Sequence, residues 1–196
     1  GDWVFYGCSS LTSIVIPDGV TEIGYYAFVL CHSLTSITIP DSVTKIVSFA
    51  FYDCQSLTSI DIPNSVKYIG NCAFKNCCSL TSINIPDGIT LIESGVFAYC
   101  SGLTSITLPE NVTLISSHAF NHCKGLTSIN IPSGVTSLEK GAFEYCTNLA
   151  SIIIPAKVTS IGELAFRGCT NLARIDCLPT TPPTLGAEAF NSISSN

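Results

Sequence analysis

The chain has 196 residues, of which 46% are apolar and only 11% are charged, and its formal net charge is −6. Charged residues make up about a quarter of a typical soluble protein, so this surface must be built largely from Ser, Thr, Asn and Gly. An acidic balance without a basic cluster excludes the electrostatic footprint of a nucleic-acid-binding protein. No apolar run approaches the roughly 18 to 20 residues of a membrane span, so we expect no membrane insertion within this segment.

One phrase, Phe-x-x-Cys-x-x-Leu-x-x-Ile-x-Ile-Pro, is repeated along the whole chain at an unbroken spacing of 23 residues. The phrase occurs eight times, with Leu108 replacing the last Ile of the fifth copy and Cys177 and Leu178 replacing the last Ile and the Pro of the eighth. A fixed period in this range is the signature of a solenoid. We therefore expect a single domain over residues 1–196, with an irregular closing turn at 177–196.

Each repeat is expected to begin with a strand that ends at a proline. In the second repeat, Ile37 and Ile39 are two residues apart and share one face of a strand. Pro40 ends this strand by removing an amide donor, and the polar residues after it favour a turn.

The second half of each repeat is expected to contain another short extended segment and then a short helical or 3₁₀ turn. Val20 to Ile23 is rich in β-branched residues, which favour a strand. Ile23, Ala27, Phe28 and Cys31 then follow at spacings that place them on one face of a helix. No single repeat can bury this face, so we expect about eight turns stacked at roughly 4.8 Å, with parallel strands and ladders of identical core residues.

The pattern L-x-x-I-x-I-P-x-x-V-T-x-I-x-x-x-A-F-x-x-C resembles the BspA-type leucine-rich repeat of bacterial and protozoan surface antigens, over about residues 3–178. The segment from Cys177 to Phe190 departs from it by one inserted residue and extra prolines. The resemblance implies a leucine-rich repeat solenoid of the α/β horseshoe class, secreted or displayed at the cell surface. It also implies no enzymatic activity, and we expect no cofactor. Family members have been implicated in adhesion to host matrix proteins and to other cells.

The eleven cysteines are more consistent with a structural role than with a chemical one. Eight of them occupy one repeated inward position, where Cys acts as a small buried hydrophobe. Cys177 is predicted to lie in the core, whereas Cys72 and Cys78 lie outside the ladder, and Cys78 is the better candidate for an exposed thiol. A zinc site built from Cys72, Cys77 and Cys78 would lack a fourth ligand.

Other candidates for metal binding or catalysis are also weak. His118 and His122 have the spacing of a zinc pair on a helix, but no Glu completes an H-E-x-x-H motif. The acidic residues after the prolines could offer oxygens to calcium, yet Asx turns explain them without a metal. We therefore predict no metal site and no catalytic residue.

The strand positions that point away from the core are the main candidate for a binding surface. Thr and Ser fill the first two outward positions of most repeats, while the third position varies. A regular sheet with one variable column is the layout of a concave recognition surface in a solenoid. The alternative is that Thr and Ser are simply soluble strand formers. The predicted binding column consists of Thr38, Asp61, Asn84, Thr107, Asn130 and Asp176.

A weaker candidate is an aromatic patch of Tyr25, Tyr26 and Tyr52, because Tyr is favoured at recognition surfaces. These features predict a non-enzymatic module that binds a protein or glycoprotein on host matrix or cells. The alternative is a structural spacer that displays other domains and has no partner of its own.

Overall fold

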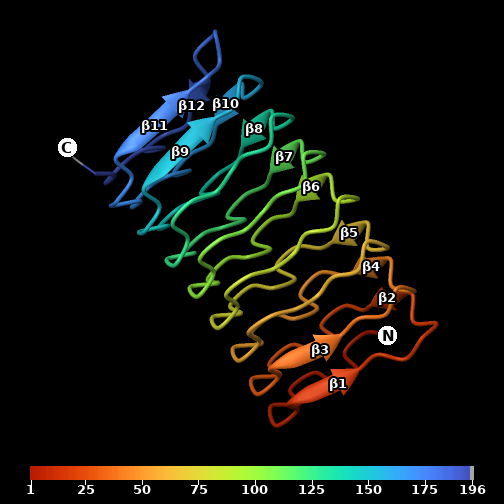
Figure 1. Ribbon diagram of the computed structural model, residues 1–196. Coiled ribbons are helices and arrows are strands. Elements are labelled where there is room, and N and C mark those ends of the chain that lie inside the picture. Colours follow the sequence, from red (N-terminus) through yellow and green to blue (C-terminus); the bar gives the residue numbers. More distant parts are fainter. Residues whose placement is uncertain (195–196) are drawn as a thin grey trace.

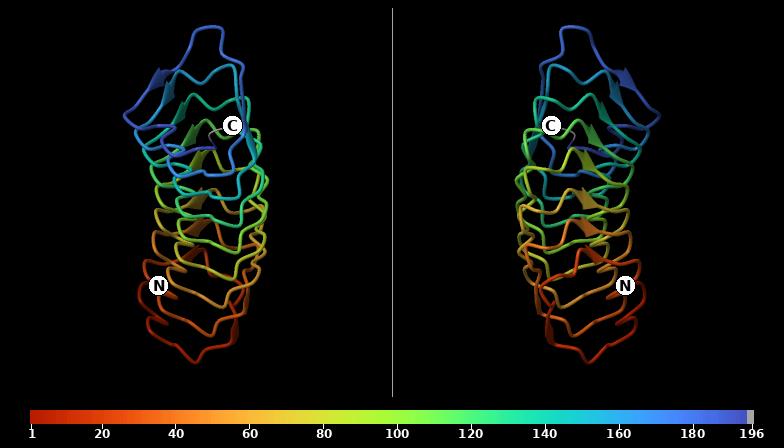
Figure 2. Two further views of the ribbon diagram at one scale, coloured as in Figure 1. Left: turned by 90° about the vertical axis from the view of Figure 1, so that its left-hand side faces the viewer. Right: turned by 90° about the vertical axis from the view of Figure 1, so that its right-hand side faces the viewer.

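The computed structural model describes residues 1–194 as a parallel β-solenoid of about eight turns (Figure 1). The two chain ends lie towards opposite ends of the stack (Figure 2). Each turn contains a first strand segment, a corner at the proline, a second strand, a run of tight turns and a second corner at the cysteine. We call the outer side of the stacked first-strand segments the first-strand face, and the outer side of the stacked runs of tight turns the turn face.

The strands are short, and all of them pair in parallel with the neighbouring repeat. The first strands are β1 (Ser13–Val15), β3 (Ser36–Thr38), β9 (Ser151–Ile154) and β11 (Arg174–Cys177). The second strands are β2 (Glu22–Ile23), β4 (Lys45–Ile46), β5 (Tyr68–Ile69), β6 (Leu91–Ile92), β7 (Leu114–Ile115), β8 (Ser137–Leu138), β10 (Ser160–Ile161) and β12 (Thr184–Leu185). Each residue pairs with its copy in the next repeat, and the inserted residue of the last repeat is absorbed before β12, where Ser160 pairs with Thr184.

The core consists of ladders of equivalent residues, as the repeat predicts. Leu34, Phe28 and Val43 are almost completely buried, and so are their copies as far as Leu172, Phe166 and Val158. The phenylalanine rings stack without interruption from Phe5 to Phe190, with centroids 5.1 to 5.9 Å apart. Because every ring packs on its copies, the repeats stabilise one another rather than themselves.

The predicted helical turns are wrong, since the structure has no helix among residues 1–194. Two residues in each turn run have positive φ, for example Tyr26 at 57° and Leu30 at 61°. A residue with positive φ at every fourth position breaks a right-handed helix. The buried face was nevertheless predicted correctly, because Ala27, Phe28 and Cys31 all point into the core.

Hydrogen bonds to the next repeat hold this unfavourable backbone in place. The N–H groups of Phe49, Phe51 and Asp53 donate to carbonyls of the following repeat at 2.8 to 2.9 Å. The alternate N–H groups close four-residue β-turns, as in Ala50 to Val47 at 3.2 Å. The ladder therefore compensates for a conformation that an isolated repeat would not keep.

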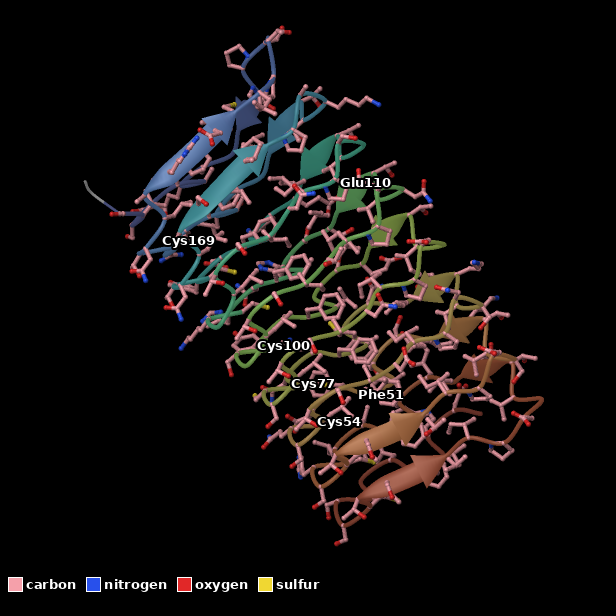
Figure 3. All side chains as sticks on the ribbon, in the orientation of Figure 1. Phe51, Cys54, Cys77, Cys100, Glu110 and Cys169 are labelled. Carbon is pink, nitrogen blue, oxygen red and sulfur yellow. The ribbon has the colours of Figure 1, made fainter. Side chains whose placement is uncertain are left out.

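The ladder cysteines are hydrogen-bond donors as well as core residues. Each buried thiol donates to the carbonyl oxygen of the phenylalanine 26 residues earlier, as in Cys100 to Phe74 at 3.1 Å. Cys54, Cys77, Cys100 and Cys169 follow one another along the stack (Figure 3). Burial raises the pKa of these thiols, for Cys31 to about 11 and for Cys169 to about 12.

Two predictions about individual cysteines need correction. Cys177 is exposed rather than buried, because no further repeat packs on β11, the first strand of the last repeat. Cys78 is only half-buried, like Cys72, and the other exposed thiol is Cys8 in the first repeat. The position of a repeat in the stack, rather than its sequence, decides which cysteines meet solvent.

Candidate functional site

The first outward column of the first-strand face is a row of threonines whose hydroxyls are already used by the fold. The Oγ1 atom of Thr58 donates to the carbonyl oxygen of Thr35 at 3.4 Å, and Thr81 bonds to Thr58 in the same way. The same bond recurs along the face, at 3.1 to 3.4 Å, from Thr35, Thr104 and Thr127. These hydroxyls reinforce the contact between repeats and are not free donors for a partner.

The third outward column differs, because its functional groups are not used by the fold. Thr38, Asp61, Asn84, Thr107 and Asn130 are all exposed. Thr38 pairs with Asp61 and Asn84 with Thr107 through parallel bridges, so their side chains lie on neighbouring repeats. No side-chain hydrogen bond or ion pair within residues 1–194 involves these five residues.

A polar hollow lies beside this column at its N-terminal end. It has a volume of about 730 Å³ and is lined by Thr38, Asp61 and Asn84, together with Asp41 and Asn64 of the adjacent corner. Two carboxylates and two amides thus surround one depression without a basic side chain among them. Such a site suits a partner that offers hydrogen-bond donors or cations.

Asp176 does not resemble the rest of the predicted column. It is half-buried, and its carboxylate accepts from Arg174 through both oxygens, at 2.9 and 3.1 Å. Val15 and Ile153 occupy the same column and are 73% and 47% exposed. The unbonded polar side chains of the column therefore extend from Thr38 to Asn130, with Val15 at one end and Ile153 at the other.

Backbone hydrogen bonds between repeats differ in length between the two faces. Backbone N–H···O distances between repeats are 3.2 to 3.4 Å on the first-strand face from Thr58 to Ala150. On the turn face, the N–H groups of the stacked phenylalanines lie only 2.7 to 3.0 Å from their acceptors. These hydrogen bonds are therefore shorter on the turn face than along this part of the first-strand face.

The three tyrosines of the predicted aromatic patch lie in one cluster on the turn face. Tyr25 contacts Tyr26 at a centroid distance of 4.9 Å, and Phe49 joins them to Tyr52. Trp3 stacks on Tyr26 at 4.2 Å. Trp3 and Phe49 were not predicted, although both precede their ladder phenylalanine by two residues, as Tyr26 does.

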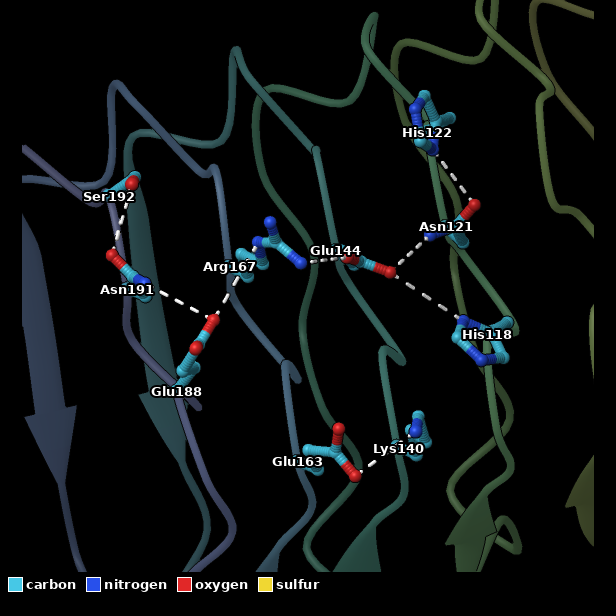
Figure 4. Close-up of polar contacts among 10 residues, drawn as sticks. All are labelled: His118, Asn121, His122, Lys140, Glu144, Glu163, Arg167, Glu188, Asn191 and Ser192. Atoms are coloured by element: carbon cyan, nitrogen blue, oxygen red, sulfur yellow. Dashed lines mark hydrogen bonds and ion pairs between the residues drawn. The ribbon is translucent and has the colours of Figure 1, made fainter.

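A second cluster on the turn face surrounds the buried carboxylate of Glu144 (Figure 4). Asn121 donates to Glu144 Oε2 at 2.9 Å, and His118 Nδ1 lies 3.8 Å from the same oxygen. Arg167 Nη1 lies 3.7 Å from Oε1. His122 bonds to Asn121 and stacks on Tyr99 with their ring centroids 4.6 Å apart.

A third polar cluster holds the carboxylate of Asp53, which is also buried. His32 Nε2 lies 3.0 Å from Oδ2, while Gln55 and Asn76 donate to Oδ1. Burial alone would raise the pKa of Asp53, but the hydrogen bonds from Gln55, His32 and Asn76 outweigh it and lower the pKa. Asp53 is therefore a satisfied structural carboxylate.

The three histidines, His32, His118 and His122, are half-exposed and take part in these clusters. His118 and His122 both have positive φ, so their spacing is not that of a helical metal pair. Within residues 1–194, no group of three or more His, Cys, Asp or Glu side chains is placed to hold a metal ion. Nor does any helix in that range have the length and apolar character needed to cross a bilayer.

Sequence reasoning treated the turn side as variable surface and missed the Glu144 and Asp53 clusters. A signal was present, since Asp53, Asn76 and Gly168 share one position of the repeat, and Gly95 and Gly141 share another. These residue types are the ones that tolerate positive φ. Their recurrence marks left-handed turns, which place the side chains of neighbouring repeats side by side.

Comparison with known proteins shows the family to which the repeat belongs. The family model described as a BspA type leucine rich repeat region matches residues 1–126 and residues 90–196. The chain belongs to the BspA-type leucine-rich repeat family. No curated protein matches it.

Solved structures of bacterial leucine-rich repeat proteins share the fold of this BspA-type chain. A protein from Eubacterium ventriosum is 28% identical over 88% of this chain, with a TM-score of 0.73. A T. pallidum protein is 32% identical over 89% of this chain and 73% of its own, with a TM-score of 0.70. A leucine rich cell surface protein from Faecalibacterium prausnitzii is 28% identical over 98% of this chain and 65% of its own, with a TM-score of 0.51. The chain spans only 45% of the Eubacterium protein.

Proposed function

We propose that this chain is a non-enzymatic, secreted or surface-displayed module that binds a protein or glycoprotein on host matrix or cells. The proposed contact surface is the third outward column of the first-strand face, from Thr38 to Asn130. Membership of the BspA-type family and similarity to a protein described as a cell surface protein support this assignment.

One observation carries the proposal: two columns of the same face use their polar groups differently. The threonines of the first column bond to the preceding repeat, as Thr81 does to Thr58. The five side chains of the third column form no such bond within the described residues, although they lie on the same face of the solenoid. Polar groups that the fold does not use are available for recognition. The serines of the second outward column are also unbonded, but they are identical from Ser36 to Ser128, so the third column is what gives this face a pattern that a partner can distinguish.

The chemistry of the column indicates the kind of partner. Asp61 and the nearby Asp41 line the polar hollow, and Asn84 and Asn64 add amide groups. A partner surface that carries Lys or Arg together with hydrogen-bond donors would complement them. Binding should therefore weaken as ionic strength rises, because exposed charges are screened over about 8 to 10 Å.

The geometry of the polar clusters supports a non-enzymatic role. His32 and Asp53 form a close pair, but the thiol beside them, Cys54, donates to the carbonyl oxygen of Phe28. Burial raises the pKa of that thiol, which keeps it protonated. A protonated, buried thiol is not a nucleophile.

A variant with Ala at all five column positions would test the proposal. Its matched control replaces the serines of the neighbouring outward column, Ser36, Ser59, Ser82, Ser105 and Ser128, with Ala. We expect the first variant to lose at least about tenfold in capture of immobilised extracellular-matrix glycoproteins and of intact host cells, while the control retains it. Undiminished capture by a folded column variant would contradict the proposal.

The structural spacer remains a second candidate, because one observation favours it. Hydroxyl bonds in the threonine column and stacked rings in the core connect every repeat to the next, which suits a stiff rod. If the unmodified chain captures neither matrix glycoproteins nor cells, the spacer function is supported instead.

A further inference from the structure

The turn face contains a hollow that belongs to neither the aromatic patch nor the proposed protein-binding column. It has a volume of about 520 Å³ and lies across repeats four to seven. Small-molecule sites commonly fall within about 300 to 1,000 Å³. The hollow is a separate feature and requires its own explanation.

The hollow exists because two neighbouring columns of the turn face carry small residues in the same repeat. Ala98 occupies a position that holds Tyr52, Lys75 and Asn121 in neighbouring repeats. Gly95 stands in the column of Cys72 and His118, has a φ of +62°, and a Cβ atom there would lie 2.9 Å from Cys72 Sγ. These two residues line a depression between longer side chains.

A cation without an anionic partner stands at one end of the hollow. Lys75 is half-buried, and its ammonium lies 5.8 Å from the ring centroid of Tyr52 and 5.7 Å from that of Tyr99. No carboxylate within residues 1–194 forms an ion pair with it. By contrast, Lys140 and Arg167 of later repeats both pair with glutamates. Lys75 can therefore bind an anion without first breaking an ion pair.

Several neutral hydrogen-bonding groups surround the same hollow. Asn71 accepts from the Ser94 amide through Oδ1, which leaves its NH₂ group available, and the Ser94 hydroxyl makes no bond within the described residues. Tyr99 and Tyr145 line the hollow and offer both apolar carbons and a hydroxyl. The hollow also includes the Glu144 carboxylate, whose oxygens face Asn121, His118 and Arg167. It thus combines one cation without an ion-pair partner, several donors, apolar ring surface and one carboxylate that is already paired.

The Glu144 cluster makes His122, which lines the hollow, a hydrogen-bond acceptor. Asn121 donates its NH₂ group to Glu144, so its carbonyl oxygen must accept from His122 Nδ1 at 2.8 Å. The Nε2 atom of a neutral His122 then carries a lone pair. Burial and the nearby Lys124 lower the pKa of His122, although Glu144 opposes them, which favours this neutral form.

The backbone around the hollow is already paired, which excludes recognition of a peptide main chain. The Gly95 N–H donates to Ser117 O at 2.9 Å, and the Ala98 carbonyl accepts from Asn76 at 2.8 Å. A peptide that adds to a sheet edge needs such groups to be unpaired. A sugar is recognised through side chains alone, because its ring offers several hydroxyls and an apolar face.

From this combination we propose that the hollow over Gly95 and Ala98 binds a sugar residue that carries a carboxylate. The carboxylate pairs with Lys75, and the ring hydroxyls bond to Asn71, Ser94 and His122 Nε2. The apolar face of the sugar packs against the edge carbons of Tyr99, because the face of that ring stacks on His122. The acid could be a sialic acid or a uronic acid, and the two sources are separated by the test below.

The test compares two matched pairs of ligands by calorimetry and by the NMR shift of the Ala98 methyl group. Sialyllactose is compared with lactose, and glucuronic acid with glucose. We expect at least one acidic sugar to bind and its neutral counterpart to bind about tenfold more weakly or worse, and the pair that shows this difference identifies the source. Equal binding within both pairs, or no binding of either acidic sugar, would overturn the proposal.

Two variants and one control connect the binding to the hollow. Lys75→Gln removes the charge but keeps most of the stem, and Ala98→Tyr fills the hollow with the side chain that Tyr52 places at the same repeat position. Each should weaken binding of the acidic sugar about tenfold or more, whereas Lys157→Gln on a distant part of the solenoid should not. Retained binding by a folded Ala98→Tyr variant would contradict the proposal.

A peptide of consecutive glutamates serves as the last probe. If it binds as tightly as the acidic sugar, the hollow recognises acidic protein surfaces and the proposal fails. The variant with Ala at the five third-column positions should keep sugar binding unchanged. Failure of protein capture and failure of sugar binding can therefore be told apart.

Discussion

The first-strand face and the turn face are built by the same 23-residue repeat, yet they differ in how much they vary along the stack. On the first-strand face, Thr81 and its copies make one bond again and again. On the turn face, one repeat position carries Tyr52, Lys75, Ala98 and Asn121 in succession. A uniform column stabilises the stack, whereas a changing column creates local sites.

This difference shows which residues of a solenoid are available for function. The residues shared by all repeats are engaged with their copies, as Phe51 is with Phe74 and Cys77 with the carbonyl of Phe51. The proposed sites use residues that differ between repeats, namely the third column of one face and the hollow of the other. The following predictions test this separation between shared and individual residues.

The largest expected effect comes from raising the pH, which acts on the shared thiols. Seven cysteines are buried, and folding raises their pKa above the ordinary value of 9.0. The unfolded chain therefore loses its thiol protons at a lower pH than the folded chain. The contribution of the buried thiols to the free energy of unfolding is complete below pH 9.0 and decreases as the pH rises towards their pKa values in the folded state. Each thiol should lower the free energy of unfolding by about 1.4 kcal/mol per pH unit in that range.

Urea unfolding at a series of pH values from 8 to 11 would measure this slope, with circular dichroism as the readout. The variant Cys100→Ala should be less stable at neutral pH but should show a shallower alkaline decline. A flat profile in the unmodified chain would mean that the ladder thiols already meet solvent.

A core substitution in the middle of the stack should have the next largest effect. Leu103 is completely buried between copies of itself, so Leu103→Ala should cost about 2 to 5 kcal/mol in the free energy of unfolding. Leu11 in the first repeat is only half-buried, and Leu11→Ala should cost less. Equal losses, measured by denaturant unfolding, would contradict the assignment of the core to stacked ladders.

A smaller effect should separate the two hydroxyl columns of the first-strand face. Thr81→Val removes the bond to the Thr58 carbonyl while keeping the shape of the side chain, and should cost about 0.5 to 1 kcal/mol. Ser82→Ala, in the next outward position, breaks no bond within the described residues and should stay within about 0.5 kcal/mol of the unmodified chain. Thermal unfolding of both variants would detect the difference, and equal stabilities would show that the threonine bond contributes nothing.

The sequence was sufficient to predict the solenoid, because a period of 23 residues with fixed inward positions leaves few alternatives. It also placed Ala27, Phe28 and Cys31 on a common buried face. The helical turn was wrong because the spacing of buried residues does not distinguish a helix from tight turns with positive φ. That distinction depends on hydrogen bonds to the next repeat, such as Phe28 N–H to Ala50 O, which no single repeat reveals.

The candidate sites were predictable only in part. The column from Thr38 to Asn130 follows from strand alternation, but the pairing of Asp176 with Arg174 depends on side-chain geometry. The hollow over Gly95 and Ala98 could not be predicted, since it arises where two columns carry small residues in the same repeat. Such a feature requires knowledge of which columns lie side by side.

The central claim is that shared residues build the stack and individual residues recognise partners. It is tested most directly by measuring melting temperature and partner capture together on two variants of the same face. The first has Ala at Thr38, Asp61, Asn84, Thr107 and Asn130, and the second has Val at Thr35, Thr58, Thr81, Thr104 and Thr127. We predict that the first variant loses capture and keeps its melting temperature, while the second loses several degrees and keeps capture at temperatures where it is folded. The opposite result, in which the threonine column carries capture and the third column carries stability, would contradict the account.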